Sequence, residues 1–192
     1  MPTSTKQKSP KFVYFFGGGK AEGRGDQKQL LGGKGAGLAE MTNIGLPVPP
    51  GFTLTTTACN AYYDRKRRWP AGLEAQIKRN VGKLERLQGK KLGDPNDPLL
   101  VSVRSGAGLS MPGMMETILN LGLNDQSVEG LANKTKKPRF AYDAYRRFIM
   151  MYGTTAMNLN KKEFENVFDE YKHKVVAKRL GRGKKQPVGD TE

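Results

Sequence analysis

The sequence predicts a mixed α/β (α+β) fold, with a mixed sheet and several helices, on three observations. Short apolar runs of strand length are bounded by glycine or proline. Longer runs place their apolar residues at helical spacing. Glycine and proline, 24 and 11 of the 192 residues, separate these runs. The length allows one domain, or one domain with an extension.

The N-terminal region begins with a polar stretch, residues 1–10, which we expect to be disordered. A strand is expected near residues 11–16, and a glycine-rich turn follows over 17–25. That turn has two interpretations, a mobile hairpin connection or a cradle for phosphate. We favour the hairpin connection.

A second glycine-rich segment, residues 30–41, leads into a predicted helix with Lys34 near its start. A helix N-terminus carries about half a positive charge and free N–H groups, so a lysine there would strengthen the attraction for an anion. The segment is not a Walker A loop, because Gly35 rather than Ser or Thr follows the lysine. Taken alone, it is more typical of a plain helix cap.

Gly45 is expected to end this helix, and the prolines at 47, 49 and 50 prevent its continuation. The following elements are expected as a strand at 51–55, helices at 58–66 and 73–87, a break at 94–98 and a strand within 116–123.

The apolar run at residues 99–103 predicts a buried strand that delivers Arg104 to a glycine-rich loop. A guanidinium can fork onto phosphate oxygens, and glycines let backbone N–H groups approach a polyanion closely. Ser105, Ser110 and Thr117 add hydroxyl donors. The pattern indicates a triphosphate site; the alternative is an ordinary surface loop with an arginine at its root.

The chain is predicted to be helical from about 138 to 180, and two apolar stripes at helical spacing are expected to pack into the core. The stripes consist of Ala141, Tyr145, Phe148, Ile149 and Tyr152, and of Phe164, Val167, Phe168, Tyr171 and Val175. Arg146 and Arg147 are adjacent on the first helix, so at most one of them can face a nucleotide while the other faces solvent or an acidic partner.

A formal net charge of +15 raises a different possibility, a basic noncatalytic module that binds nucleotides or nucleic acid. The basic clusters lie at 65–68, 134–139 and 178–185. They are scattered and lack interleaved aromatic residues, so we do not expect nucleic acid as the partner.

Cys59 is the only cysteine, so an internal disulfide is impossible, as suits a reducing cytosol. We expect it on the buried face of a helix. The N-terminus lacks the apolar core of a signal peptide, and no run reaches membrane-spanning length. These features predict a cytoplasmic protein without a membrane partner.

Taken together, several ordered motifs resemble the N-terminal end of the pyruvate, phosphate dikinase family. The segments that carry the resemblance are 14–20, 31–36, 45–53, 101–117, 119–124, 140–143 and 145–149. The related phosphoenolpyruvate synthases share parts of the Lys34 and Arg104 segments. The Phe-Gly-Gly-Gly start and the Met-Pro-Gly-Met-Met loop favour the dikinase.

The resemblance implies that residues 11–192 form the N-terminal portion of an ATP-grasp nucleotide-binding domain, truncated before the rest of that domain. It implies that Lys34 and Arg104 bind ATP and that the loop around Gly113 closes over the phosphates. The expected ATP-binding residues are Lys34, Arg104, Ser105, Gly106, Ser110, Gly113, Met114, Met115 and Thr117.

Enzymes of this family convert ATP, pyruvate and phosphate to AMP, phosphoenolpyruvate and diphosphate through a phosphohistidine. Because 192 residues are far too few for the whole enzyme, the resemblance implies that the phosphohistidine and pyruvate-binding domains lie outside this chain. His173, the only histidine, lacks the family's setting for the relay and is expected to be a solvated helix residue. No catalytic residue is therefore assigned here, and this chain alone is expected to be inactive.

The remaining expectations from the resemblance concern the metal and the partners. Mg²⁺ would arrive with ATP, since the family's acidic ligands lie later in the chain. Pyruvate and phosphate would bind partly to other domains, and a homodimer is expected only for the full enzyme.

Overall fold

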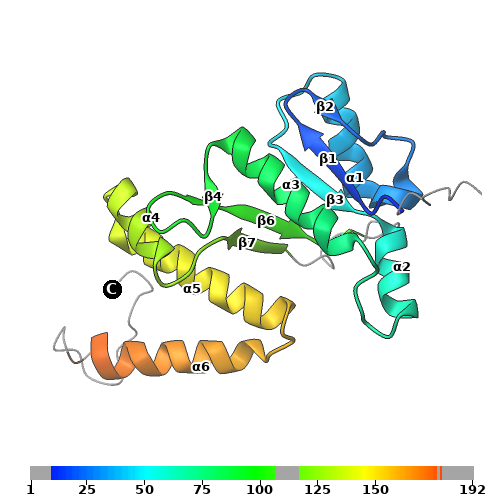
Figure 1. Ribbon diagram of the computed structural model, residues 1–192. Coiled ribbons are helices and arrows are strands. Elements are labelled where there is room, and N and C mark those ends of the chain that lie inside the picture. The colour runs from blue at the N-terminus through cyan, green and yellow to red at the C-terminus, as the bar shows by residue number, and fades with distance from the viewer. Residues whose placement is uncertain (1–9, 107–116, 177, 179–192) are drawn as a thin grey trace, which may run out of the picture.

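A computed structural model describes residues 10–106, 117–176 and 178 (Figure 1). The elements in chain order are β1 (Val13–Gly17), β2 (Lys20–Ala21), α1 (Lys28–Asn43), β3 (Gly51–Leu54), α2 (Thr56–Asp64), α3 (Leu73–Gln88), β4 (Lys91–Leu92), β5 (Pro98–Leu99), β6 (Val101–Arg104), β7 (Thr117–Leu121), α4 (Ser127–Thr135), α5 (Pro138–Thr155), α6 (Lys161–Tyr171) and the π-helical turn η1 (Lys172–Val176). The predicted mixture of helices and short strands is confirmed.

An antiparallel sheet with strand order β2-β1-β3 forms the N-terminal half. The hairpin between β1 and β2 turns through Gly18 and Gly19, whose φ angles are +63° and +79°. A two-residue hairpin turn with both φ angles positive suits glycine, because a Cβ would be strained there. The favoured interpretation of this glycine-rich turn, a hairpin connection, is confirmed.

The central strand β1 is buried on both faces, because α1 and α3 pack on opposite sides of the sheet (Figure 1). Toward α3, Phe15 packs with Leu84 and with Leu99 of β5. Toward α1, Tyr14 packs against a cluster that contains Leu31. Successive side chains of β1 point to opposite faces of the sheet, so this one strand packs against α3 on one face and α1 on the other.

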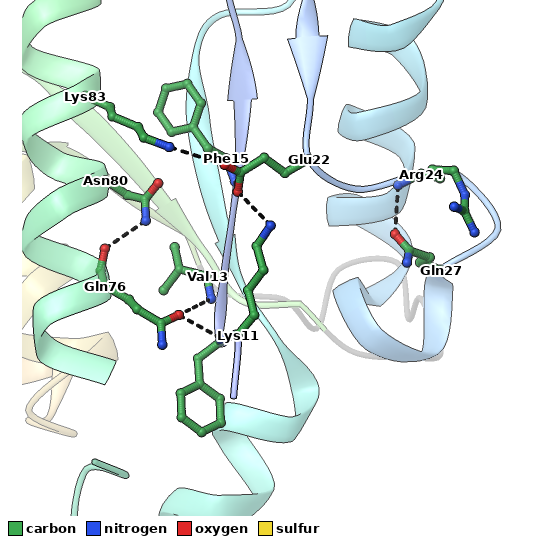
Figure 2. Close-up of polar contacts among 10 residues, drawn as sticks. Lys11, Val13, Phe15, Glu22, Arg24, Gln27, Gln76, Asn80 and Lys83 are labelled. Atoms are coloured by element: carbon green, nitrogen blue, oxygen red, sulfur yellow. Dashed lines mark hydrogen bonds and ion pairs between the residues drawn. The ribbon is translucent and has the colours of Figure 1, made fainter. Parts of the chain in front are cut away.

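Polar contacts fix the start of β1 against α3 (Figure 2). The Gln76 Oε1 atom accepts hydrogen bonds from the N–H groups of Phe12 (2.8 Å) and Val13 (3.2 Å), and its Nε2 donates to the Pro10 carbonyl (2.9 Å). One side chain thus satisfies three backbone groups that the sheet leaves unpaired.

Glu22, just after β2, joins the hairpin to α3 (Figure 2). Its Oε2 accepts from the Phe15 N–H at 3.0 Å and lies 3.1 Å from Lys11 Nζ, while its Oε1 lies 3.2 Å from Lys83 Nζ. Partial burial by itself raises the pKa of Glu22, but the N–H group and the two ammonium groups outweigh it and lower the pKa overall.

The predicted single buried strand at 99–103 is wrong in two respects. The run divides into β5, which pairs in parallel with β4, and β6, which pairs antiparallel with β7. Leu99 is buried, but Val103 is 46% exposed. The reason is that β6 and β7 form a two-stranded ribbon, and the part of the chain that the structure describes places no third strand beside it.

Helix α1 ends as predicted at Gly45, which has a φ angle of +85°. The Gly45 N–H donates to the Thr42 carbonyl and the Leu46 N–H to the Met41 carbonyl, the pattern of a Schellman motif.

Cys59 lies on α2, but it is exposed, and the expectation of a buried face is wrong. The residue of α2 that is buried is Ala58, which directly precedes Cys59.

The C-terminal half is helical, with α5 running beneath the β6-β7 ribbon and α6 lying alongside α5 (Figure 1). Helix α4 had no counterpart in the prediction. Its start is held by Asn124, whose Oδ1 accepts from the backbone N–H groups of Gln126 and Ser127. Val128 and Ala132 then pack against Ala141 of α5.

The expectation that both apolar stripes belong to the core is wrong for much of their length. Helix α6 has no buried residue, and Ile149 of α5 is 44% exposed. The two stripes face a groove of about 620 Å³, which Ile149, Val167 and Tyr171 help to line. Helical spacing correctly predicted an apolar face, but nothing in the described part of the chain closes over it.

No helix in the described ranges is both long and apolar enough to cross a membrane.

The Glu22 contacts predict a pH-dependent contribution to stability. Because the folded-state pKa is lowered, the stabilisation is present above the unfolded pKa of about 4.3 and is lost as the pH falls through the lower folded value. Glu22→Gln should lower the free energy of unfolding by about 1 kcal/mol at neutral pH, after allowance for solvent screening. The difference should shrink near pH 3 in denaturant titrations. Glu163→Gln, at the exposed start of α6, is the control; a pH-independent effect of Glu22→Gln would contradict the prediction.

Two helical glycines predict opposite responses to alanine. A Cβ at Gly130 of α4 would lie 2.1 Å from the Pro95 carbonyl oxygen, whereas at Gly82 of α3 the nearest atom is the flexible end of Arg86, at 3.6 Å. Gly82→Ala should therefore stabilise the protein by about 0.5–1 kcal/mol, and Gly130→Ala should destabilise it by about 1–3 kcal/mol. Thermal unfolding of the two variants measures both, and equal shifts would refute the packing argument.

Candidate functional site

Lys34 owes its position to a break in α1. The helix is interrupted at Gly32, whose φ and ψ angles are 70° and 165°, a conformation almost restricted to glycine. The second helical piece therefore starts immediately before Lys34, as the sequence predicted. The half-buried lysine lies in the first turn of this piece, where the helix dipole is positive.

Gly35 brings this turn close to the sheet. A Cβ at Gly35 would lie 2.6 Å from Thr53 Cγ2 of β3, so only glycine allows this approach without displacement. The prediction did not include this contact. The sequence feature that could have predicted this contact is Gly35 itself. A glycine inside a helix lowers its stability, so its presence there suggests that close packing requires it.

Arg104 ends β6 and lies directly opposite Thr117 of β7. The base of the ribbon is anchored by Val101, which packs against the cluster of Phe15, Leu84 and Leu99. Arg104, at the other end of the strand, is exposed. The ribbon thus carries a guanidinium and a hydroxyl side by side, away from the core.

One contact joins the two predicted segments. Lys34 Nζ donates a hydrogen bond of 3.3 Å to the backbone carbonyl of Ser105, 71 residues further along the chain. Ser105 follows Arg104 directly, so the ammonium group and the root of the glycine-rich loop lie together. The sequence predicts that both segments bind anions, and this hydrogen bond brings them together in the fold.

Of the remaining predicted site residues, one lies within the described part of the chain and four lie outside it. Gly106 is exposed and continues from Ser105. Ser110, Gly113, Met114 and Met115 lie outside the described residues.

Arg146 and Arg147 both pair with Asp143 rather than dividing between two partners. The shortest distances to Asp143 are 2.7 Å for each guanidinium. Partial burial acts to raise the pKa of Asp143, but the two guanidinium groups lower it overall. Arg146 also lies over the Phe168 ring, with its Cζ atom 4.5 Å from the ring centroid.

His173 is exposed on η1, as expected for a solvated helix residue.

The sequence was also compared with those of known proteins. The family model described as "Pyruvate phosphate dikinase, AMP/ATP-binding domain" matches residues 28–68, which include α1 and Lys34. Over 165 residues, 86% of this chain, the sequence is 53% identical to pyruvate, phosphate dikinase of Rhizobium meliloti. The chain is homologous to the N-terminal region of pyruvate, phosphate dikinases.

Two further dikinases give the same result. The chain is 56% identical over 162 residues to pyruvate, phosphate dikinase of Clostridium symbiosum and 53% identical over 166 residues to pyruvate, phosphate dikinase 1, chloroplastic, of Zea mays. These alignments cover 84% and 86% of this chain but only 18% and 17% of the relatives. The chain thus spans about a fifth of the length of the curated dikinases it matches.

The break in α1 predicts a difference between two neighbouring glycines. Gly32→Ala should destabilise the protein by about 1–3 kcal/mol, because alanine is strained at this φ and ψ. Gly33→Ala is the control, since a Cβ there meets no atom within 4 Å. Chemical denaturation compares the two; equal losses would show that the special conformation of Gly32 is not the cause.

Proposed function

We propose that this chain forms the ATP-binding portion of a pyruvate, phosphate dikinase, as the first part of an ATP-grasp domain. The observation that carries the proposal is the Lys34 contact with Ser105, because it unites two cationic segments from opposite halves of the fold. The family match over residues 28–68 supports it independently.

In the proposed complex, the Lys34 ammonium and the Arg104 guanidinium neutralise the phosphate charge of ATP. Arginine presents a planar pair of donors to phosphate oxygens, while lysine supplies a point charge. The N–H groups that follow Gly32 add the positive end of a helix. Thr117, opposite Arg104, contributes a hydroxyl group.

The loop between Ser105 and Thr117 is proposed to cover the phosphates, with Gly106, Ser110, Gly113, Met114 and Met115 as its contacts. Covering this site would exclude water and strengthen every charge interaction within it. In a full-length dikinase, the bound ATP would then be oriented for transfer of its β-phosphoryl group to a histidine outside this chain, with pyruvate and phosphate as the other substrates.

Magnesium belongs to the proposal only through the nucleotide. Among the described residues, no group of three or more His, Cys, Asp or Glu side chains could hold a metal ion. We propose that Mg²⁺ is bound by the phosphate oxygens of ATP, with its protein ligands outside this chain. Its charge would supplement those of Lys34 and Arg104.

The proposal is tested by calorimetric titration with Mg·ATP at moderate ionic strength. Arg104→Ala and Lys34→Ala should each weaken binding about tenfold or more, because each removes a charge-assisted contact to phosphate. Arg79→Ala, which removes an exposed arginine from α3, is the matched control and should change the affinity less than about twofold. Binding by the folded chain that neither site variant weakens would overturn the assignment of the site.

A further inference from the structure

The loop that follows α2 carries a basic and aromatic surface that the proposed ATP site does not use. We define it as the 63–69 surface: Tyr63, the four cations at 65–68, and Trp69. Tyr63 is 62% exposed and Trp69 57% exposed, and all four cations are exposed. Asp64 is the only acidic residue between positions 59 and 72.

The backbone of this loop is fixed in an unusual conformation. Lys66 and Arg67 have φ angles of +54° and +62°, so two successive residues with large side chains occupy the left-handed region. The Lys66 N–H donates to the Tyr63 carbonyl and the Arg67 N–H to the Tyr62 carbonyl, at 3.0 and 2.9 Å. This is a Schellman motif in which lysine stands where glycine would be less strained.

Stabilisation of the helix does not account for the whole surface. A cation at the C-terminal end of α2 interacts favourably with the helix dipole, but that effect is limited to the last turn. Glycine at positions 66 and 67 would close the helix with less strain. Among the described residues, no ion pair involves any of the cations at 65–68.

The chemistry of the surface fits a polypeptide partner. Tryptophan, tyrosine and arginine are the residues most enriched at the energetic centres of protein interfaces. The rings of Tyr62 and Tyr63 meet edge to face at 74°, with centroids 5.4 Å apart, so they do not form parallel platforms for successive bases. Because the surface carries four cationic side chains and one acidic neighbour, it favours a negatively charged partner.

The 63–69 surface shares no residue with the proposed ATP site. The start of α2 contacts α1, where Thr56 Oγ1 donates to the Gln29 carbonyl. The 63–69 surface begins at the other end of this nine-residue helix, about 12 Å from Thr56 along the helix axis. We propose that the 63–69 surface is a docking site for an acidic segment of a partner polypeptide.

The test uses the fluorescence of Trp69, the only tryptophan of the chain, during titration with poly-L-glutamate at low salt. The decisive variant is Lys66→Gly combined with Arg67→Gly, because it removes two cations and also relieves backbone strain, so it should melt no lower than the parent chain. It should weaken binding about tenfold or more. Tyr63→Ala should weaken it about fivefold.

The matched control is Lys136→Gly combined with Lys137→Gln. Lys136 has a φ angle of +55° at the end of α4, so this variant also removes two exposed cations, one of them from the same backbone conformation. It should change the affinity less than about twofold. An equal loss in both double variants, or no response of Trp69 to poly-L-glutamate, would overturn the proposal. Tighter binding of oligothymidylate of matched charge would overturn it in favour of single-stranded nucleic acid.

Discussion

The burial of β1 on both faces is the constraint on which the rest of the structure depends. Its alternating side chains pack Phe15 toward α3 and Tyr14 toward α1, so one strand sets the separation of the two helices. Gln76 fixes where the strand begins. Because Leu99 joins the Phe15 cluster, the same contact also determines where the β6-β7 ribbon leaves the core.

The candidate site depends on this arrangement at two points. Gly35 packs against Thr53 of the neighbouring strand, so the first turn of the second helical piece is held at the sheet with Lys34 beside it. Val101 anchors the ribbon to the Phe15 cluster, and Arg104 extends beyond it. The two cations thus come from elements that the central strand positions independently, which explains how Lys34 reaches the Ser105 carbonyl, 71 residues away in the sequence.

The exposed charged side chains fall into two groups, those that form ion pairs within the chain and those that do not. Arg146 and Arg147 are engaged by Asp143, and Asp97 pairs with both Lys90 and Lys134. These pairs are solvated, so each contributes little to stability and none indicates a ligand. The 63–69 surface differs because its cations have no acidic partner in the described part of the chain and stand beside two exposed aromatic rings.

The sequence by itself determined the features that depend on local periodicity and special residues. These include α1 and its end at Gly45, α3, and the hairpin at Gly18 and Gly19. Each follows from apolar spacing or from backbone freedom at glycine. The assignment of Lys34 and Arg104 to a phosphate site stays a prediction from the chemistry of phosphate binding.

Only the tertiary structure decided what each face packs against. The run at 99–103 was divided because β4 and β7 pair with different parts of it, and Cys59 is exposed while Ala58 next to it is buried. The contact between Lys34 and Ser105 likewise depends on packing around β1. Periodicity shows that a face is apolar or a residue cationic, but burial and proximity depend on partners distant in the chain.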